Sequence, residues 1–364
     1  MSSAFPKIAA PKVTLHHLGL AKLVGLCQAL RLGPEQTSRA VDVFETLTQH
    51  WAHASAEAKP AWPSDITDDG TPFEFSVSFH EGGADLRMLV EPQTRATTLS
   101  SNWNAGLEIN QLLRERYGAH NRDFDKVADL FAPAPGSNAQ FSIWHAAVLR
   151  PDGTRLFKVY LNPRVRGAGT ARELVNEALE RLGRRDVAER LAPALADDGS
   201  EPRYFSLDLE EARTSRVKVY VGRSDNVEAI DRLASSVSDL APGEAAAWVE
   251  RLSRRRERFA ARPILTCFAF DNESAAATAT VHVPVRCYVK NDAESANAVC
   301  GFLSPLQAAS FRRVLSALSP CSLEDNTGLI TYASLRKSSR GPRVTVYLAP
   351  QVYSFGDGLK LPLG

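Results

Sequence analysis

The chain has 364 residues, of which 44% are apolar and 23% are charged, and its formal net charge is +1. These values are typical of a globular protein with a sizeable core, and they exclude an overall basic field that would hold nucleic acid or an anionic membrane. The five cysteines include no CxxC pair, which argues against a disulfide framework and a zinc site and favours reduced thiols.

Nothing in the sequence indicates export or a membrane span. The first residues lack a positively charged segment followed by an apolar one, and no run of about 18 apolar residues occurs. We therefore expect a cytoplasmic protein, a monomer or weak homodimer, that binds neither membranes nor nucleic acid.

Residues 14–57 are predicted to form helices that flank the main body. Apolar residues such as Leu20, Leu23 and Val24 recur at mixed three- and four-residue spacing, which is the helical period. Gly33 and Pro34 interrupt the pattern, so we expect the helical segment to break there.

The first predicted hairpin follows a turn-rich stretch. Residues 73–79 alternate strictly between apolar and polar, and a second strand, 85–90, comes after Gly82 and Gly83. If these glycines form a two-residue turn, Glu74 shares one face of the hairpin with Arg87. The other face is then apolar.

Four further hairpins are expected at 141–161, 203–221, 264–289 and 328–348, separated by helical stretches near 105–131, 170–194, 225–259 and 291–319. Ten antiparallel strands exceed what a strongly twisted open sheet usually holds, which favours a closed barrel with helices outside. We therefore predict a single domain over residues 1–364, in the α/β class of the α+β kind. The polar strand faces would line the lumen.

A repeated pattern marks these four hairpins. In each, a tyrosine follows a basic residue by two or four positions, so both side chains share one strand face. The tyrosines recur at intervals of about 60 residues, as expected for a repeated supersecondary unit. They are Tyr160, Tyr220, Tyr288 and Tyr347.

Basic side chains would therefore converge in the lumen, where they repel one another unless an anion compensates. Tyrosine faces attract a carbocation, by about 2 kcal/mol each when desolvated. An allylic diphosphate that ionises produces both charges. The alternatives are a solvated surface position for each cation and ordinary packing for each tyrosine. The cations are Arg87, Lys158, Arg216, Lys218, Arg286 and Arg343.

In the order and spacing of its motifs, nearly the whole chain resembles the dimethylallyltryptophan synthase family of aromatic prenyltransferases. The motifs are DDGTPFEF at 68–75, KVY at 158–160, RVKVY at 216–220, RCY at 286–288 and RVTVY at 343–347. The resemblance implies a ten-stranded barrel of five αββα units around a polar lumen. It also implies that the basic residues bind dimethylallyl diphosphate and that the four tyrosines shield the carbocation.

By the same resemblance, Glu74 accepts a hydrogen bond from the indole N–H. The chemistry of a carboxylate supports this role. The indole N–H becomes more acidic as the ring is attacked, so its hydrogen bond to the carboxylate strengthens in the transition state. A salt bridge to Arg87 is the alternative. His282 shares strand parity with Arg286 and is the candidate base or proton relay, or else a structural histidine.

Residues 150–154 suit a three-residue loop with Gly153 left-handed, which would pair Trp144 with Tyr160 and make Trp144 a wall of the indole pocket. Trp144 with His282 resembles bacterial members that prenylate free L-tryptophan on the benzene ring, with C6 as the first choice. Prenylation at N1, C5 or C7, and of tyrosine, a cyclic dipeptide or another indole, stays open.

No predicted helix carries a DDxxD-type carboxylate set, because Asp68–Asp69 and Asp197–Asp198 both fall in loops. We therefore predict turnover without a metal or other cofactor. The rival from another class is a non-catalytic barrel that binds an anionic hydrophobic ligand. Such a carrier would need the cations, but not Glu74 opposite them.

Overall fold

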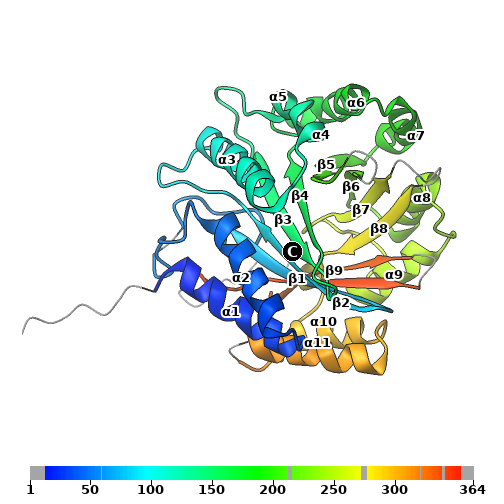
Figure 1. Cartoon of the computed structure of the whole chain (residues 1–364). Coiled ribbons are helices and arrows are strands. Elements are labelled where there is room, and N and C mark those ends of the chain that lie inside the picture. The colour runs from blue at the N-terminus through cyan, green and yellow to red at the C-terminus, as the bar shows by residue number, and fades with distance from the viewer. Residues whose placement is uncertain are drawn as a thin grey trace, which may run out of the picture.

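The computed structural model describes residues 13–58, 60–211, 215–271, 277–319, 321–337 and 341–353. Ten antiparallel strands close into a barrel in which β1 pairs with both β2 and β10 (Figure 1). The predicted ten-stranded barrel is thus confirmed. Its strands are β1 (Phe73–His80), β2 (Gly83–Val90), β3 (Ile143–Leu149), β4 (Arg155–Leu161), β5 (Glu201–Asp208), β6 (Val217–Arg223), β7 (Ile264–Phe270), β8 (Thr278–Val283), β9 (Ile330–Arg336) and β10 (Arg343–Leu348).

Helices cover the outside of the barrel (Figure 1). No described helix is both long and apolar enough to cross a bilayer. The expected break after the first helix is present, with Pro34 in the first turn of the second. The helices are α1 (Leu15–Ala29), α2 (Pro34–Thr48), α3 (Leu99–Tyr117), α4 (Arg122–Asp125), α5 (Ala128–Phe131), α6 (Ala171–Arg181), α7 (Arg185–Ala196), α8 (Val227–Val237), α9 (Glu244–Ser253), α10 (Asp292–Cys300) and α11 (Pro305–Leu318).

The core lies between the helices and the outer face of the barrel. On β1, Phe73 and Phe75 point outward and pack on Phe44 of α2, with ring centroids 5.4 and 5.8 Å away. Glu74 and Ser76 alternate with them and point into the lumen. One-sided alternation in the sequence therefore decides which face of each strand meets the helices.

The first hairpin turn differs from the prediction. His80 pairs with Gly83, so the two-residue loop is Glu81–Gly82 rather than Gly82–Gly83. This moves the pairing by two residues, which is a whole side-chain period, and Glu74 and Arg87 still share the inner face. The turn between β3 and β4 is as predicted: Gly153 has φ 85° and Trp144 pairs with Tyr160.

The predicted hairpin 264–289 was wrong in its second strand, which we expected to continue to residue 289. Strand β8 ends at Val283, and Val285–Cys287 form a 3-10 helix. Pro284 has no backbone N–H to donate to the β ladder, which explains the end of the strand. Arg286 and Tyr288 consequently leave the inner face that His282 occupies.

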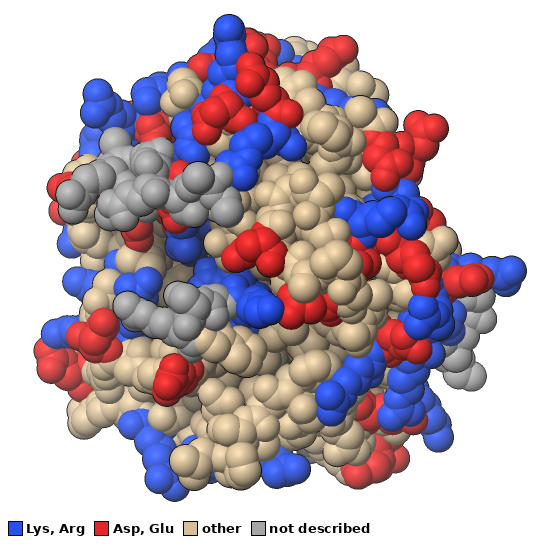
Figure 2. Space-filling model, turned by 90° about the vertical axis from the view of Figure 1, so that its right-hand side faces the viewer, with Lys and Arg blue, Asp and Glu red and all other residues tan. Residues whose placement is uncertain are grey.

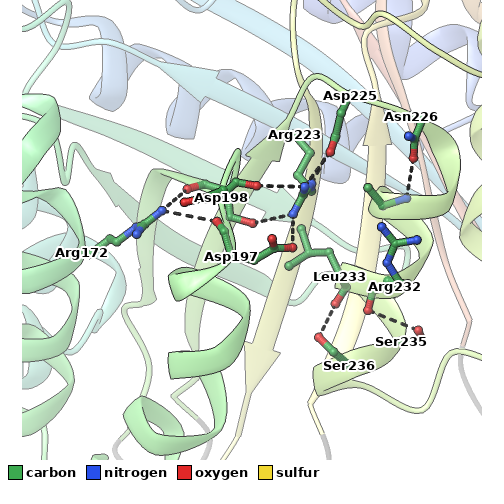
Figure 3. A network of polar contacts seen from close by, with 12 residues as sticks. Arg172, Asp197, Asp198, Arg223, Asp225, Asn226, Arg232, Leu233, Ser235 and Ser236 are labelled. Atoms are coloured by element: carbon green, nitrogen blue, oxygen red, sulfur yellow. Dashed lines mark hydrogen bonds and ion pairs between the residues drawn. The ribbon is translucent and has the colours of Figure 1, made fainter.

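A polar network ties the end of α7 to the barrel (Figure 3). The guanidinium of buried Arg223, the last residue of β6, binds the Asp197 carboxylate, the Asp198 carbonyl and, at 2.6 Å, Asp225. Arg172 of α6 donates to the Ser200 carbonyl at 3.0 Å. The Asp197–Asp198 pair therefore serves this junction.

Candidate active site

The lumen holds two adjoining chambers. The cationic chamber has a volume of about 140 Å³ and lies toward the hairpin turns. The aromatic chamber, of about 80 Å³, lies toward the other end, where the helical connections leave the barrel. Both chambers are lined by Tyr220, His282 and Tyr347, so these side chains form the boundary between them.

Basic residues of six strands or their flanking turns surround the cationic chamber. The molecular face in Figure 2 is hollowed left of its centre, and Lys and Arg side chains gather in that hollow. The chamber contains five of the six predicted cations and two more that the sequence analysis missed, Arg150 and Arg336. The full set is Arg87, Arg150, Lys158, Arg216, Lys218, Arg336 and Arg343.

Asp208, on β5, holds three of these cations together. Its carboxylate lies 3.2 Å from Lys158 Nζ and 2.7 Å from Arg216 Nε, and it also binds Lys218. Burial alone would raise the pKa of Asp208, but the three cations hold it well below its usual range. Burial lowers the pKa of both lysines, and Asp208 opposes this.

The remaining cations are poorly compensated. Arg343 lies 2.9 Å from Asp85, whereas Arg87 has no hydrogen-bond or ion-pair partner among the described residues. Arg336 Nε is buried and also lacks a partner in the described part of the chain. Burial and the neighbouring Arg343 lower the pKa of Arg336 to about 10. Seven cations thus face two carboxylates, Asp85 and Asp208, which leaves an anion-binding site.

Glu74 lies in the aromatic chamber. Its Oε2 accepts a 2.7 Å hydrogen bond from the Thr331 hydroxyl. Burial raises the pKa of Glu74 to about 8, and the Thr331 hydrogen bond opposes the rise. The alternative salt bridge to Arg87 is not formed among the described residues. One carboxylate oxygen is therefore free of a described partner and can accept a donor from a ligand.

Aromatic rings form the walls around Glu74. Trp144 stacks on Phe141 with centroids 3.8 Å apart, and its indole N–H has no partner in the described segments. The Tyr220 hydroxyl donates to the Tyr160 hydroxyl at 3.4 Å. The sequence analysis missed two further wall residues, Tyr204 and Tyr332.

His282 lies at the boundary between the chambers. Its ring centroid is 5.6 Å from that of Tyr220 and 5.7 Å from that of Tyr347. Its Nε2 is buried without a described partner, and burial, with Arg87, lowers its pKa to about 3. His282 is therefore neutral. His145 points away from the lumen and bonds Asn110 at 3.0 Å.

Arg286 and Tyr288 do not join the other predicted site residues. Arg286 forms an ion pair with Asp68, and the Tyr288 hydroxyl donates to the Arg262 carbonyl. Neither lines a chamber, because β8 ends before them. Tyr332 and Arg336 of β9 line the chambers instead. Tyr332 and Arg336 are four residues apart and therefore share one face of the strand, as in the repeated pattern but with the tyrosine first. This spacing was a signal in the sequence that could have identified them.

Comparison with known proteins decides the family. A family model described as tryptophan dimethylallyltransferase matches residues 32–317. The chain belongs to this family. The resemblance to dimethylallyltryptophan synthases is thereby confirmed, and the protein is a transferase of the tryptophan dimethylallyltransferase family. No group of three His, Cys, Asp or Glu side chains suited to a metal occurs among the described residues.

Solved structures of two dimethylallyltryptophan synthases and of one further prenyltransferase match nearly the whole chain. The 6-dimethylallyltryptophan synthase from Micromonospora olivasterospora, in complex with DMASPP and Trp, is 29% identical with a TM-score of 0.85, over 94% of this chain and 98% of that one. The 5-dimethylallyl tryptophan synthase from Streptomyces coelicolor, in complex with the same two molecules, is 30% identical with a TM-score of 0.86, over 94% and 97%. Prenyltransferase PriB, in a ternary complex with L-tryptophan and dimethylallyl thiolodiphosphate, is 30% identical with a TM-score of 0.84, over 94% and 97%.

Proposed function

We propose that the protein transfers a dimethylallyl group from dimethylallyl diphosphate to the indole ring of L-tryptophan, with C6 as the first choice of position. The observation that carries the proposal is the meeting of the two chambers. An anion site with uncompensated cations adjoins an aromatic pocket that contains a carboxylate, and three aromatic side chains lie between them. The relatives solved with DMASPP and Trp support the two substrates.

In the proposed reaction, the bond from C1 of the dimethylallyl group to the diphosphate oxygen breaks, and the diphosphate takes both electrons. The cationic chamber stabilises the charge on the diphosphate, which is the role that a metal has in other enzymes, so turnover needs no metal. Tyr160, Tyr220 and Tyr347 present ring faces to the carbocation. Tyr332 lines the same chamber and joins this group.

The ring carbon then bonds to C1, and the proton on that carbon must leave. Glu74 accepts the hydrogen bond of the indole N–H and stabilises the positive charge that develops on the ring. Trp144 stacks along the wall and holds the ring in position. His282, neutral and with a buried Nε2 that has no partner in the described segments, is the proposed acceptor of the proton.

The test is to incubate the protein with dimethylallyl diphosphate and L-tryptophan, with and without EDTA, and to locate the new carbon bond by NMR. We expect one product in equal yield under both conditions, prenylated at C6. Relatives that are 29% and 30% identical carry the names of 6- and 5-dimethylallyl synthases, so the NMR assignment alone decides the position. Tight donor binding without any product would instead favour a carrier, and loss of product with EDTA would refute the metal-free reaction.

A further inference from the structure

A third and larger cavity adjoins the aromatic chamber on its outer side. Its volume is about 850 Å³, and its walls come from two loops, 134–141 and 162–168, and from β5. It shares Asp65 and Tyr204 with the aromatic chamber. A ligand whose indole occupies the aromatic chamber can therefore extend past these two residues into the outer cavity.

The outer cavity is much larger than the aliphatic part of one amino acid requires. Pockets of about 300–1,000 Å³ enclose ligands of drug size. The aromatic chamber, at about 80 Å³, offers room for little beyond a ring. The acceptor pocket thus continues into a space that suits several more residues of a peptide.

Charges are arranged along this space in an order. Asp65, where the cavities meet, lies 3.6 Å from Arg262. Further out, Arg203 pairs through Nη2 with Glu201 at 2.6 Å, but its Nε is buried and has no partner among the described residues. Arg164 lies 3.9 Å from Glu201, which is a loose contact. Asp65 and its partner Arg262 therefore lie next to the indole site, and Arg203 and Arg164 lie beyond them.

We infer that the outer cavity is a subsite for a peptide chain, and that the enzyme prenylates short linear peptides whose N-terminal residue is tryptophan. The inference rests on the proposed function. The free ammonium group next to the indole pairs with Asp65. The Arg203 guanidinium lines the outer cavity and donates to the first peptide carbonyl, and Arg164 binds the C-terminal carboxylate. The bonds made and broken are those of the reaction on tryptophan, with diphosphate and a proton as the other products.

The experiment compares three acceptors with dimethylallyl diphosphate: L-tryptophan and the dipeptides Trp-Ala and Ala-Trp. The dipeptides have one composition, but only Trp-Ala has its ammonium group on the tryptophan residue. We expect Trp-Ala to be prenylated with kcat/KM at least about tenfold above that of Ala-Trp. In the Arg164→Ala variant, the ratio of kcat/KM for Trp-Ala to that for tryptophan falls by about tenfold. Arg232→Ala, at an exposed position of α8, is the control and leaves the ratio unchanged.

The outcomes separate the two proposals. Turnover of tryptophan with neither dipeptide accepted overturns the peptide subsite and leaves the proposed function standing. Equal rates for the two dipeptides, or an unchanged ratio in Arg164→Ala, also overturn it. Turnover of Trp-Ala without turnover of tryptophan supports the subsite and corrects the proposed acceptor. If no acceptor is prenylated, both proposals are wrong.

Discussion

Glu74 is a carboxylic acid buried among aromatic rings, and we propose that it is the chemical centre of the acceptor pocket. Because the pKa of Glu74 is raised to about 8, the carboxylate that the indole N–H needs is a minority form at pH 7. We expect kcat/KM for tryptophan to rise with pH through about pH 8, where half of Glu74 is ionised, and to level off above about pH 9. Steady-state rates across this range measure the effect. In Thr331→Val, which loses the hydroxyl that stabilises the charged form, the rise should move to higher pH.

Replacement of Glu74 by Gln should lower kcat by about 100-fold or more, because a neutral amide stabilises the developing positive charge poorly.

The Glu74→Gln variant should also be more stable than the wild type at high pH. Between about pH 4.5 and 8 the folded protein keeps a proton that the unfolded chain has lost, so stability falls as pH rises through this range. Denaturant unfolding at pH 8.5 should show a gain on the order of 3 kcal/mol. Undiminished turnover in Glu74→Gln would contradict the catalytic role of Glu74. Equal stability of the variant and the wild type at pH 8.5 would contradict the effect of burial on its pKa.

Asp208 should control donor binding through the charge of the lysines beside it. In Asp208→Asn, Lys158 and Lys218 lose the partner that opposes the effect of burial, and their pKa values fall further. We expect the KM for dimethylallyl diphosphate to rise at least about tenfold and to climb at a lower pH than in the wild type. The pH dependence of donor KM is the measurement.

The matched control is Asp85→Asn. Asp85 pairs with Arg343, which keeps its charge throughout the accessible pH range, and its other oxygen lies 3.1 Å from His80 Nε2. Neither partner is a lysine, so this variant should change donor KM without moving the pH at which that KM climbs. If Asp208→Asn behaves in the same way, Asp208 has only a packing role.

At the level of helices and strands, local periodicity predicted which elements form and which way their faces point. The alternation in 73–79 assigned Phe73 and Phe75 to the helix side and Glu74 to the lumen. Features that depend on backbone hydrogen bonding at particular positions were not predictable in this way. The exact turn pair at Glu81–Gly82 depends on the register that barrel closure selects. The end of β8 at Pro284 was predictable, and its neglect misplaced Arg286 and Tyr288.

The residues of the candidate site also fall into two groups, those that local sequence patterns predicted and those that they did not. Lys158 and Tyr220 were found because each follows the repeated strand pattern, and Trp144 was found because the predicted turn pairs it with Tyr160. Asp208 and Thr331 were not found from the sequence. An acid such as Asp208 becomes informative only when the cations around it are known, and a hydroxyl such as that of Thr331 only when the carboxylate that it contacts is known. Those partners come from strands far apart in the chain.

The seating of α1 on its neighbours depends on a glycine. A methyl group added at Gly19 would overlap the ring of Phe44, which is itself fixed against Phe73. We expect Gly19→Ala to lower the free energy of unfolding by about 1–3 kcal/mol. Gly25→Ala in the same helix is the control: its methyl group would lie 3.6 Å from the nearest atom, an ordinary contact. It should raise stability by about 0.5–1 kcal/mol through helix propensity, and thermal unfolding of both variants measures the contrast.

For the whole molecule, the excess positive charge links anion binding to stability. Inorganic pyrophosphate without magnesium should raise the melting temperature by several degrees, since a ligand at about 100 times its Kd adds about 2.7 kcal/mol. Sodium chloride at 0.5 M should reduce the shift by screening. The shift should be smaller in Arg336→Gln, which removes a cation without a described partner. A single transition would support our proposal that the chain folds as one domain, whereas a shift that requires magnesium would contradict metal-free recognition.

The closed ring of strands has a consequence for the length of the prenyl donor. Every strand is hydrogen-bonded to a neighbour on each side, so the wall cannot widen at one place without breaking a ladder. The barrel backbone therefore fixes the diameter of the lumen. Selection between five-carbon and longer isoprenoid donors then depends on the side chains that fill the interior. Replacement of a bulky aromatic side chain by a small residue, as in Trp144→Gly, would make room for a ten-carbon chain. Such a replacement leaves the closed barrel intact.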